Sequence, residues 1–210
     1  MTKYGKLTTV LIAVLFVFAL VASGLHLFTT GPNQPPLPLG LGAVTPLVLF
    51  LVWFAASPQF RQFTMTLNSS VLTLVQSWRI VGYVFLVLAA YGILPSLFAL
   101  SAGWGDIAIG ATAPLVALKL ANPGRRRSFI AWQLLGMADL VTAVTLGTLA
   151  GVIDPHGVGA SAMTVLPLSL IPTFGVPLFM MLHVICIAQA AKRPVRQPST
   201  LGQQLEPHSA

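Results

Sequence analysis

Long apolar runs alternate with short polar segments along the whole chain, and this alternation predicts six helices. Each run is long enough to cross a hydrocarbon layer of about 30 Å at a rise of about 1.5 Å per residue. We place the six spans at about residues 7–28, 38–57, 71–95, 99–121, 129–153 and 164–190. The predicted fold class is therefore an all-α polytopic membrane helix bundle with six transmembrane helices.

The first run also has features of a secretory signal peptide. Lys3 and Lys6 precede it, and "VASG" near its end resembles a cleavage site. Its apolar core is longer than that of a typical signal, so we interpret it as a retained span. The two halves of the chain share no repeat, so residues 1–191 are predicted to form a single transmembrane domain. Residues 192–210 are predicted to form a disordered cytoplasmic tail.

The composition supports a membrane location and argues against nucleic acid as a partner. Hydrophobic residues make up 56% of the chain and charged residues only 7%, whereas soluble domains carry roughly 25% charged residues. The net charge is +7, but the basic residues stand in short clusters between the apolar runs. The single cysteine, Cys186, excludes a disulfide framework or a cysteine metal cluster within one chain.

The basic clusters also predict an orientation. They precede the first span, follow the second, fourth and sixth spans, and are absent from the other three loops: Lys3, Lys6, Arg61, Lys119, Arg125, Arg126, Arg127, Lys192, Arg193 and Arg196. By the positive-inside rule both ends of the chain lie in the cytoplasm. The predicted location is the cell inner (plasma) membrane, with the lipid bilayer as the immediate partner.

Three ionisable side chains fall within the predicted spans, where charges are costly and are often functional. Arg79, Asp139 and His183 each lie roughly 10–15 Å above the inner boundary, so we expect them to meet at one level. Helical spacing adds polar or small neighbours on the same faces: Gln76, Gly82 and Tyr83 beside Arg79, Ala143, Gly147 and Gly151 beside Asp139, and Ser169, Thr173 and Met180 beside His183. The predicted intramembrane polar pocket comprises Arg79, Asp139, His183, Gln76 and Thr173.

The last span contains Pro167, Pro172 and Pro177, which are expected to bend or break its helix and to free carbonyls that line a cavity. Structural readings of the charged residues stay open beside the functional one. Arg79 and Asp139 could form a salt bridge that docks two helices, or Arg79 could extend to the inner interface beside Trp78. His183 could be a hydrogen-bonded packing residue, or it could titrate or bind a metal.

Asp106 lies near the start of the fourth predicted span, in "LSAGWGD". We expect it to cap this helix at its outer end, because aspartate accepts hydrogen bonds from free N–H groups there. Alternatively, Asp106, Trp104 and His26 line an outward-facing pocket. Asp154 and His156 are predicted on the same side, but no recognisable ligand spacing supports a metal site.

The segment "LPSLFALSAGWGDIAIGATAP" resembles a pattern found in bacterial multi-spanning membrane proteins without an assigned activity. The resemblance covers about residues 75–185. Its parts are Trp78 with Arg79, then Leu94 through Asp106, then Gly136 with Asp139, and finally Pro172, Pro177 and His183. It implies a membrane protein of about six helices and supports the choice of these residues, but it implies no function.

The function expected from the sequence is binding or transport of a small solute through the intramembrane pocket, and whether the protein is an enzyme stays open. One alternative is a haem-type redox protein, although His26 and His183 lie at different depths for a shared haem. Another is a structural or assembly protein of the inner membrane. No cofactor, substrate or coupling ion follows from the sequence, and a homodimer is possible through the small-residue face that carries Asp139.

Overall fold

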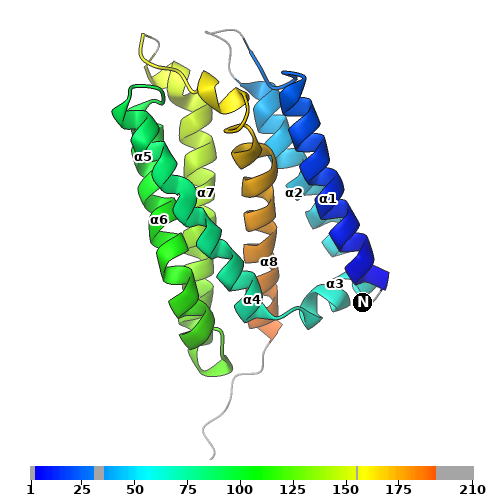
Figure 1. Ribbon diagram of the computed structural model, residues 1–210. Helices are drawn as coiled ribbons and strands as arrows, with labels where there is room; N and C mark the ends of the chain where they lie inside the picture. The colour runs from blue at the N-terminus through cyan, green and yellow to red at the C-terminus, as the bar shows by residue number, and fades with distance from the viewer. Residues whose placement is uncertain (1–2, 31–35, 155, 193–210) are drawn as a thin grey trace, which may run out of the picture.

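The computed structural model describes residues 3–30, 36–154 and 156–192, and in this part of the chain the regular structure is helical throughout (Figure 1). Four long segments are single helices: α1 (Lys3–Gly24), α2 (Leu37–Ala56), α6 (Ser96–Lys119) and α7 (Arg126–Ile153). Two more are composite: α4 (Ser69–Val75), η1 (Gln76–Gly82) and α5 (Tyr83–Ala90), and later η4 (Ile171–Gly175) and α8 (Val176–Lys192). The helix α3 (Pro58–Thr66) and the 3₁₀ turns η2 (Pro123–Arg125) and η3 (Ser161–Thr164) connect them. The all-α prediction is confirmed.

Five of the six predicted spans have the length and apolar composition that crossing a membrane needs. They are Lys3–Gly24, Leu37–Ala56, Ser69–Ala90, Arg126–Ile153 and Ile171–Lys192. Helix α6 has 24 residues but does not meet the same hydropathy requirement, because Asp106 and several glycine and serine residues lower its hydropathy. The tail predicted from residue 192 onward lies, after Lys192, outside the described residues.

The long helices run alongside one another, and their outward faces are apolar. Figure 1 shows α5, α6 and α7 grouped together, with α8 and α2 beyond them and α1 at the far edge. Leu118 on α6 is 84% exposed and Val152 on α7 is 71% exposed. Helix α1 buries only Ala19, Ala22 and Ser23. Most of its other side chains are exposed and apolar.

The middle of the third long segment is a 3₁₀ helix. A 3₁₀ helix has three residues per turn, so side chains three positions apart lie on one face. The buried residues follow this spacing through α4, η1 and α5: Thr73, Gln76, Arg79, Gly82 and Phe85. Our prediction that Tyr83 shares the face of Arg79 assumed α-helical spacing and is wrong, since Tyr83 is 55% exposed.

The last long segment is interrupted as its prolines predict. Residues 171–175 form a π-helical turn with Pro172 near its start, and the regular helix begins only at Val176. The buried stripe of Ser169, Thr173, Met180 and His183 matches the prediction. The hydroxyl of Ser169 donates to that of Ser23 over 2.8 Å, which joins this segment to α1.

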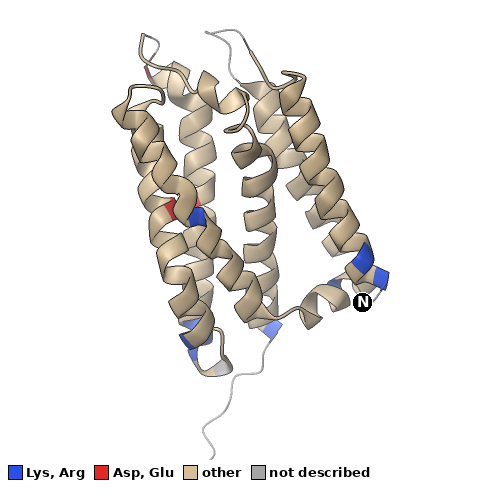
Figure 2. Ribbon diagram, in the orientation of Figure 1, with Lys and Arg blue, Asp and Glu red and all other residues tan. Residues whose placement is uncertain are grey.

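One end of the bundle carries the basic residues and is closed by hydrogen bonds. Figure 2 shows the terminal Lys and Arg residues gathered at the end where the N-terminus lies. At this end, Gln189 of α8 donates to the carbonyls of Thr64 and Leu67, at 2.7 and 2.9 Å. Trp53 of α2 stacks on Phe60 of α3 with ring centroids 3.6 Å apart. These contacts tie α2, α3 and α8 together.

Candidate functional site

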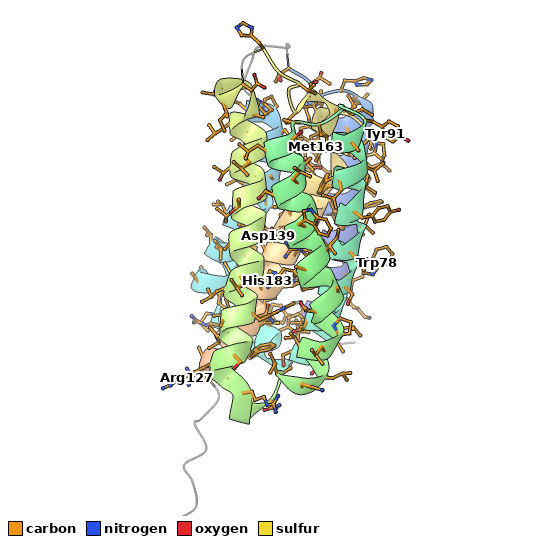
Figure 3. The ribbon with its side chains drawn as sticks, turned by 90° about the vertical axis from the view of Figure 1, so that its left-hand side faces the viewer. Trp78, Tyr91, Arg127, Asp139, Met163 and His183 are labelled. Carbon is orange, nitrogen blue, oxygen red and sulfur yellow. The ribbon has the colours of Figure 1, made fainter. Side chains whose placement is uncertain are left out.

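A buried polar layer lies between two apolar clusters halfway along the bundle. Figure 2 shows acidic and basic residues meeting there, and Figure 3 shows Asp139 and His183 between Met163 near one end and Arg127 near the other. One apolar cluster includes Phe85, Phe98, Leu94 and Met163, and the other includes Val116, Phe129, Cys186 and Ala190. The polar layer separates them on both α6 and α7.

Arg79 is the centre of this layer, and its side chain has no exposed surface. Its Nε donates to Oδ1 of Asp106 on α6 at 2.7 Å, and its Nη2 donates to Oδ2 of Asp139 on α7. Nη1 donates to the carbonyl of Gly136 at 3.1 Å. The planar guanidinium matches these diverging acceptors. Three separate helical segments are therefore joined through one side chain.

His183 of α8 is the fourth polar group, and its contacts assign its tautomer. Its Nε2 lies 3.3 Å from Nη1 of Arg79, and its Nδ1 contacts Oε1 of Gln133. Arginine can only donate hydrogen bonds, so Nε2 must accept, and Nδ1 carries the hydrogen donated to Gln133. His183 is thus a neutral imidazole with both nitrogens occupied, which favours the hydrogen-bonding reading over the metal-binding one.

Gln133 of α7 is a site residue that sequence reasoning missed. Its Nε2 donates to the hydroxyl of Thr73 at 3.2 Å, so the amide connects α4 to His183. The residue is fully buried. The signal was present in the sequence, since Gln133 is a polar residue in an apolar run and precedes Gly136 by about one helical turn on the same face.

Three glycines leave the space that the polar side chains occupy. A Cβ atom on Gly82 would collide with the side chain of Asp106, one on Gly105 with the carboxylate of Asp139, and one on Gly136 with the ring of His183. Each glycine is helical, so the reason for glycine is close approach rather than backbone conformation. The charged groups and the glycines form one packing arrangement.

The structure therefore brings together Arg79, Asp139 and His183, as the depth argument predicts. Gln76 lies on the same face and donates to the carbonyl of Phe179 at 3.2 Å. Thr173 is buried, but its hydroxyl donates to the carbonyl of Ser169 and its methyl group lies towards Gly42 of α2. Thr173 is ten residues before His183, too far along the segment to join the layer.

The prediction that Asp106 caps a helix at its outer end is wrong. Helix α6 begins at Ser96, directly after Pro95, so Asp106 is its eleventh residue. The "AGWG" segment suggests a turn, but these residues are helical because the small side chains let η1 and α7 approach closely. Asp106 is the second carboxylate partner of Arg79, a role that we did not predict.

The predicted outward-facing pocket of Asp106, Trp104 and His26 is also not formed. Trp104 is 63% exposed, because two residues along an α-helix turn the side chain to the opposite side from Asp106. His26 lies in the turn after α1, where its carbonyl accepts from the Thr29 hydroxyl at 2.6 Å. The alternative in which Arg79 extends to the inner interface is wrong as well. Trp78 is 73% exposed, but Arg79 points inward.

A cavity of about 500 Å³ lies beside the polar layer, on the side away from the basic end. Arg79, Gly82 and Asp106 contribute to one part of its wall, and the rest is mostly apolar, including Leu39, Ala43, Phe85, Phe98, Leu140, Gly147 and Met163. The interrupted part of the last segment also lines it, through the residues from Leu170 to Gly175 except Thr173. The exposed Trp78 and Val81 also line it, so the cavity reaches the surface of the bundle.

Among the residues that the structure describes, no group of three or more His, Cys, Asp and Glu side chains lies close enough to hold a metal ion. His183 and His26 belong to different regions, with His183 in the polar layer and His26 in the turn after α1. What the arrangement offers chemically is one carboxylate, Asp106, at the wall of an apolar cavity, with Arg79 beside it and the second carboxylate, Asp139, behind on the same arginine.

Comparison with models of known protein families assigns the chain to one family. Residues 35–191 match the model of a family described as "Domain of unknown function (DUF8737)", a range that contains α2 to α7 and all of α8 except its last residue, Lys192. The chain belongs to this family. The match agrees with the resemblance to a family without an assigned activity, but it carries no information about a membrane or about bacterial origin. Helix α1 lies outside the matched region. The searches of curated proteins and of solved structures found no match.

Proposed function

We propose that the chain is an integral membrane protein that binds or transports a small solute through the cavity beside the Arg79 layer. The observation that carries this proposal is the contact between the two features: a cavity of about 500 Å³ whose wall includes Asp106 of a buried charged cluster. Cavities of roughly 300–1,000 Å³ with apolar walls and a few polar groups are typical of small-molecule sites.

The membrane part of the proposal includes six spans, with α6 as the sixth. Helix α6 has 24 residues, about 36 Å of helix, and it runs beside α5 and α7 (Figure 1). Its charged residue Asp106 is paired inside the bundle, so its lower hydropathy does not oppose a membrane position. Apolar outward faces support the same placement.

The proposed location is the cell inner (plasma) membrane. The proposed orientation places both ends of the chain in the cytoplasm. The beginning of α1 and the end of α8 carry Lys3 and Lys192, the turn between α6 and α7 carries Arg125, and the beginning of α7 carries Arg127. Figure 2 has these basic ends on one side, as the positive-inside rule requires.

Gly40 of α2 offers a way to test the cavity as a binding site. It lines the cavity, and a Cβ atom there would meet nothing within 4 Å, so a side chain can begin at this position without a clash and Gly40→Phe places a ring at the cavity wall. Gly151 of α7 also has open space around a Cβ but does not line the cavity. Gly151→Phe is therefore the matched control.

The experiment is a thermal-unfolding screen of the purified protein in detergent against small cations, anions and neutral solutes. We expect at least one solute to raise the unfolding temperature in a saturable way in the parent protein and in Gly151→Phe, but not in Gly40→Phe. If no solute of any charge class stabilises the protein, or if Gly40→Phe responds fully, the proposal of a solute site in this cavity is wrong.

A further inference from the structure

The charges of the polar layer do not balance. Arg79 contributes one positive charge, Asp106 and Asp139 contribute two negative charges when ionised, and His183 is neutral by its hydrogen bonds. These are the charged and titratable groups that η1, α6, α7 and α8 bring to the layer. The sum is minus one. An unbalanced charge in an apolar interior is costly, so the layer requires one proton or one bound cation.

Arg79 and Asp106 both line the cavity, but the side chain that keeps exposed surface is the carboxylate and not the guanidinium. The side chain of Arg79 is 0% exposed, and Nε, Nη1 and Nη2 each have an acceptor. The side chain of Asp106 keeps 14% of its surface, and Asp106 lines the cavity. A ligand in the cavity therefore meets negative charge at its polar wall and apolar side chains elsewhere.

We propose that the ligand of this site is a hydrophobic organic monocation, which binds with its charge beside Asp106 in exchange for one proton. This inference rests on the proposed function and names its substrate class. The exchange conserves charge: one O–H bond of a carboxyl in the Asp106–Asp139 pair breaks, the proton passes to the solution, and the cation takes its place. The layer is neutral before and after, as a low-dielectric site requires. An anion would instead raise the negative charge of the site.

The test compares two probes with the same shape and opposite charge, tetraphenylphosphonium and tetraphenylborate. Binding to the full chain in detergent is measured by equilibrium dialysis, with protein-free micelles subtracted for partitioning. We expect tetraphenylphosphonium to bind saturably, with release of about one proton into weak buffer, and tetraphenylborate not to bind saturably.

Asp106→Asn keeps an acceptor for Arg79 Nε while removing the charge. We expect it to weaken tetraphenylphosphonium binding by about 30-fold or more and to abolish proton release. Asp154→Asn removes an exposed acid at the opposite end of α7 from the basic residues and should leave both unchanged. Gly40→Phe should abolish binding.

The possible failures separate the two proposals. If tetraphenylborate binds saturably and the cation does not, the cation inference is wrong and the cavity remains a solute site for anions. If neither probe binds but a neutral solute in the thermal screen does, the cation inference is again wrong and the proposed function stands. If cation binding survives in Asp106→Asn with proton release intact, the assignment to Asp106 is wrong. If no solute of any class binds, both proposals fail.

Discussion

The two halves of the bundle, divided by the Arg79 layer, are built differently. The half towards the basic end is closed by side-chain amides: Gln189 holds the carbonyls of Thr64 and Leu67, and Gln133 binds Thr73. The other half contains a cavity of about 500 Å³.

This difference shows what the polar layer does in the fold. Side-chain amides bound to backbone carbonyls hold helices in one arrangement, because polar groups in an apolar interior need partners. An apolar cavity has no such requirement and tolerates different contents. The charged layer forms the boundary, fixed to the hydrogen-bonded half through Gln133 and open to the hollow half through Asp106. Substitutions in the two halves should therefore have opposite consequences for stability and for ligand binding.

The largest expected effect is that of Arg79→Met, which removes the side chain that joins η1, α6 and α7 at the boundary between the halves. It leaves two buried carboxylates without their cation, and we expect a loss of about 3–5 kcal/mol in the free energy of unfolding. Denaturant unfolding in detergent measures this loss. Arg127→Met, at an exposed arginine, should change little. Adding Asp106→Asn and Asp139→Asn to Arg79→Met should recover most of the stability, and a triple variant as unstable as the single one would contradict this account.

Gly105→Ala is expected to have the next largest effect. The added methyl group takes the space of the Asp139 carboxylate, so the Arg79 pair must shift, at a cost of about 1–3 kcal/mol. Gly151→Ala on α7 meets nothing within 4 Å and should be neutral or slightly stabilising. Thermal unfolding of the two variants side by side gives the comparison. Equal stability of both would mean that the layer is not closely packed at Gly105.

Gln133→Leu should weaken the closed half by a smaller amount, about 1 kcal/mol, in line with side-chain hydrogen bonds inside membrane bundles. It removes the acceptor of His183 Nδ1 and the donor to Thr73. Hydrogen exchange of α4 and α8 should increase while saturable binding in the cavity persists. Loss of binding with unchanged exchange would place Gln133 in the ligand site instead.

The smallest expected change in stability is that of Asp106→Asn, within about 0.5 kcal/mol, because a neutral amide replaces a carboxyl in a layer that holds one proton. The unfolding free energy near neutral pH measures it. The double variant Asp106→Asn, Asp139→Asn leaves Arg79 without an anion and should lose about 3 kcal/mol or more. A large loss in Asp106→Asn alone would mean that both carboxylates are ionised in the free protein.

The sequence alone was sufficient for the parts of this arrangement that depend on position along a helix. Apolar runs marked the long helices, and counting residues from the basic end placed Arg79, Asp139 and His183 at one level. The role of Asp106 could not be predicted in this way, because a glycine-rich segment before an aspartate has the local features of a turn and cap. In the structure this segment is part of α6 and packs against η1 and α7. Tyr83 was misplaced for a related reason, since nothing in "QSWRIVG" announces three residues per turn.

The 3₁₀ winding of η1 has a mechanical consequence. Seven residues advance about 14 Å along a 3₁₀ axis but about 10.5 Å along an α-helical one, and each residue turns about 20° more. If η1 rewound as an α-helix, the segment from α4 to α5 would shorten by about 3.5 Å, and its two ends would rotate against each other by about 140°. Arg79 is the middle residue of η1. The hydrogen bonds from Arg79 to its three acceptors on α6 and α7 therefore oppose this rewinding. If a change of charge in the layer released these bonds, the segment from α4 to α5 could change its length.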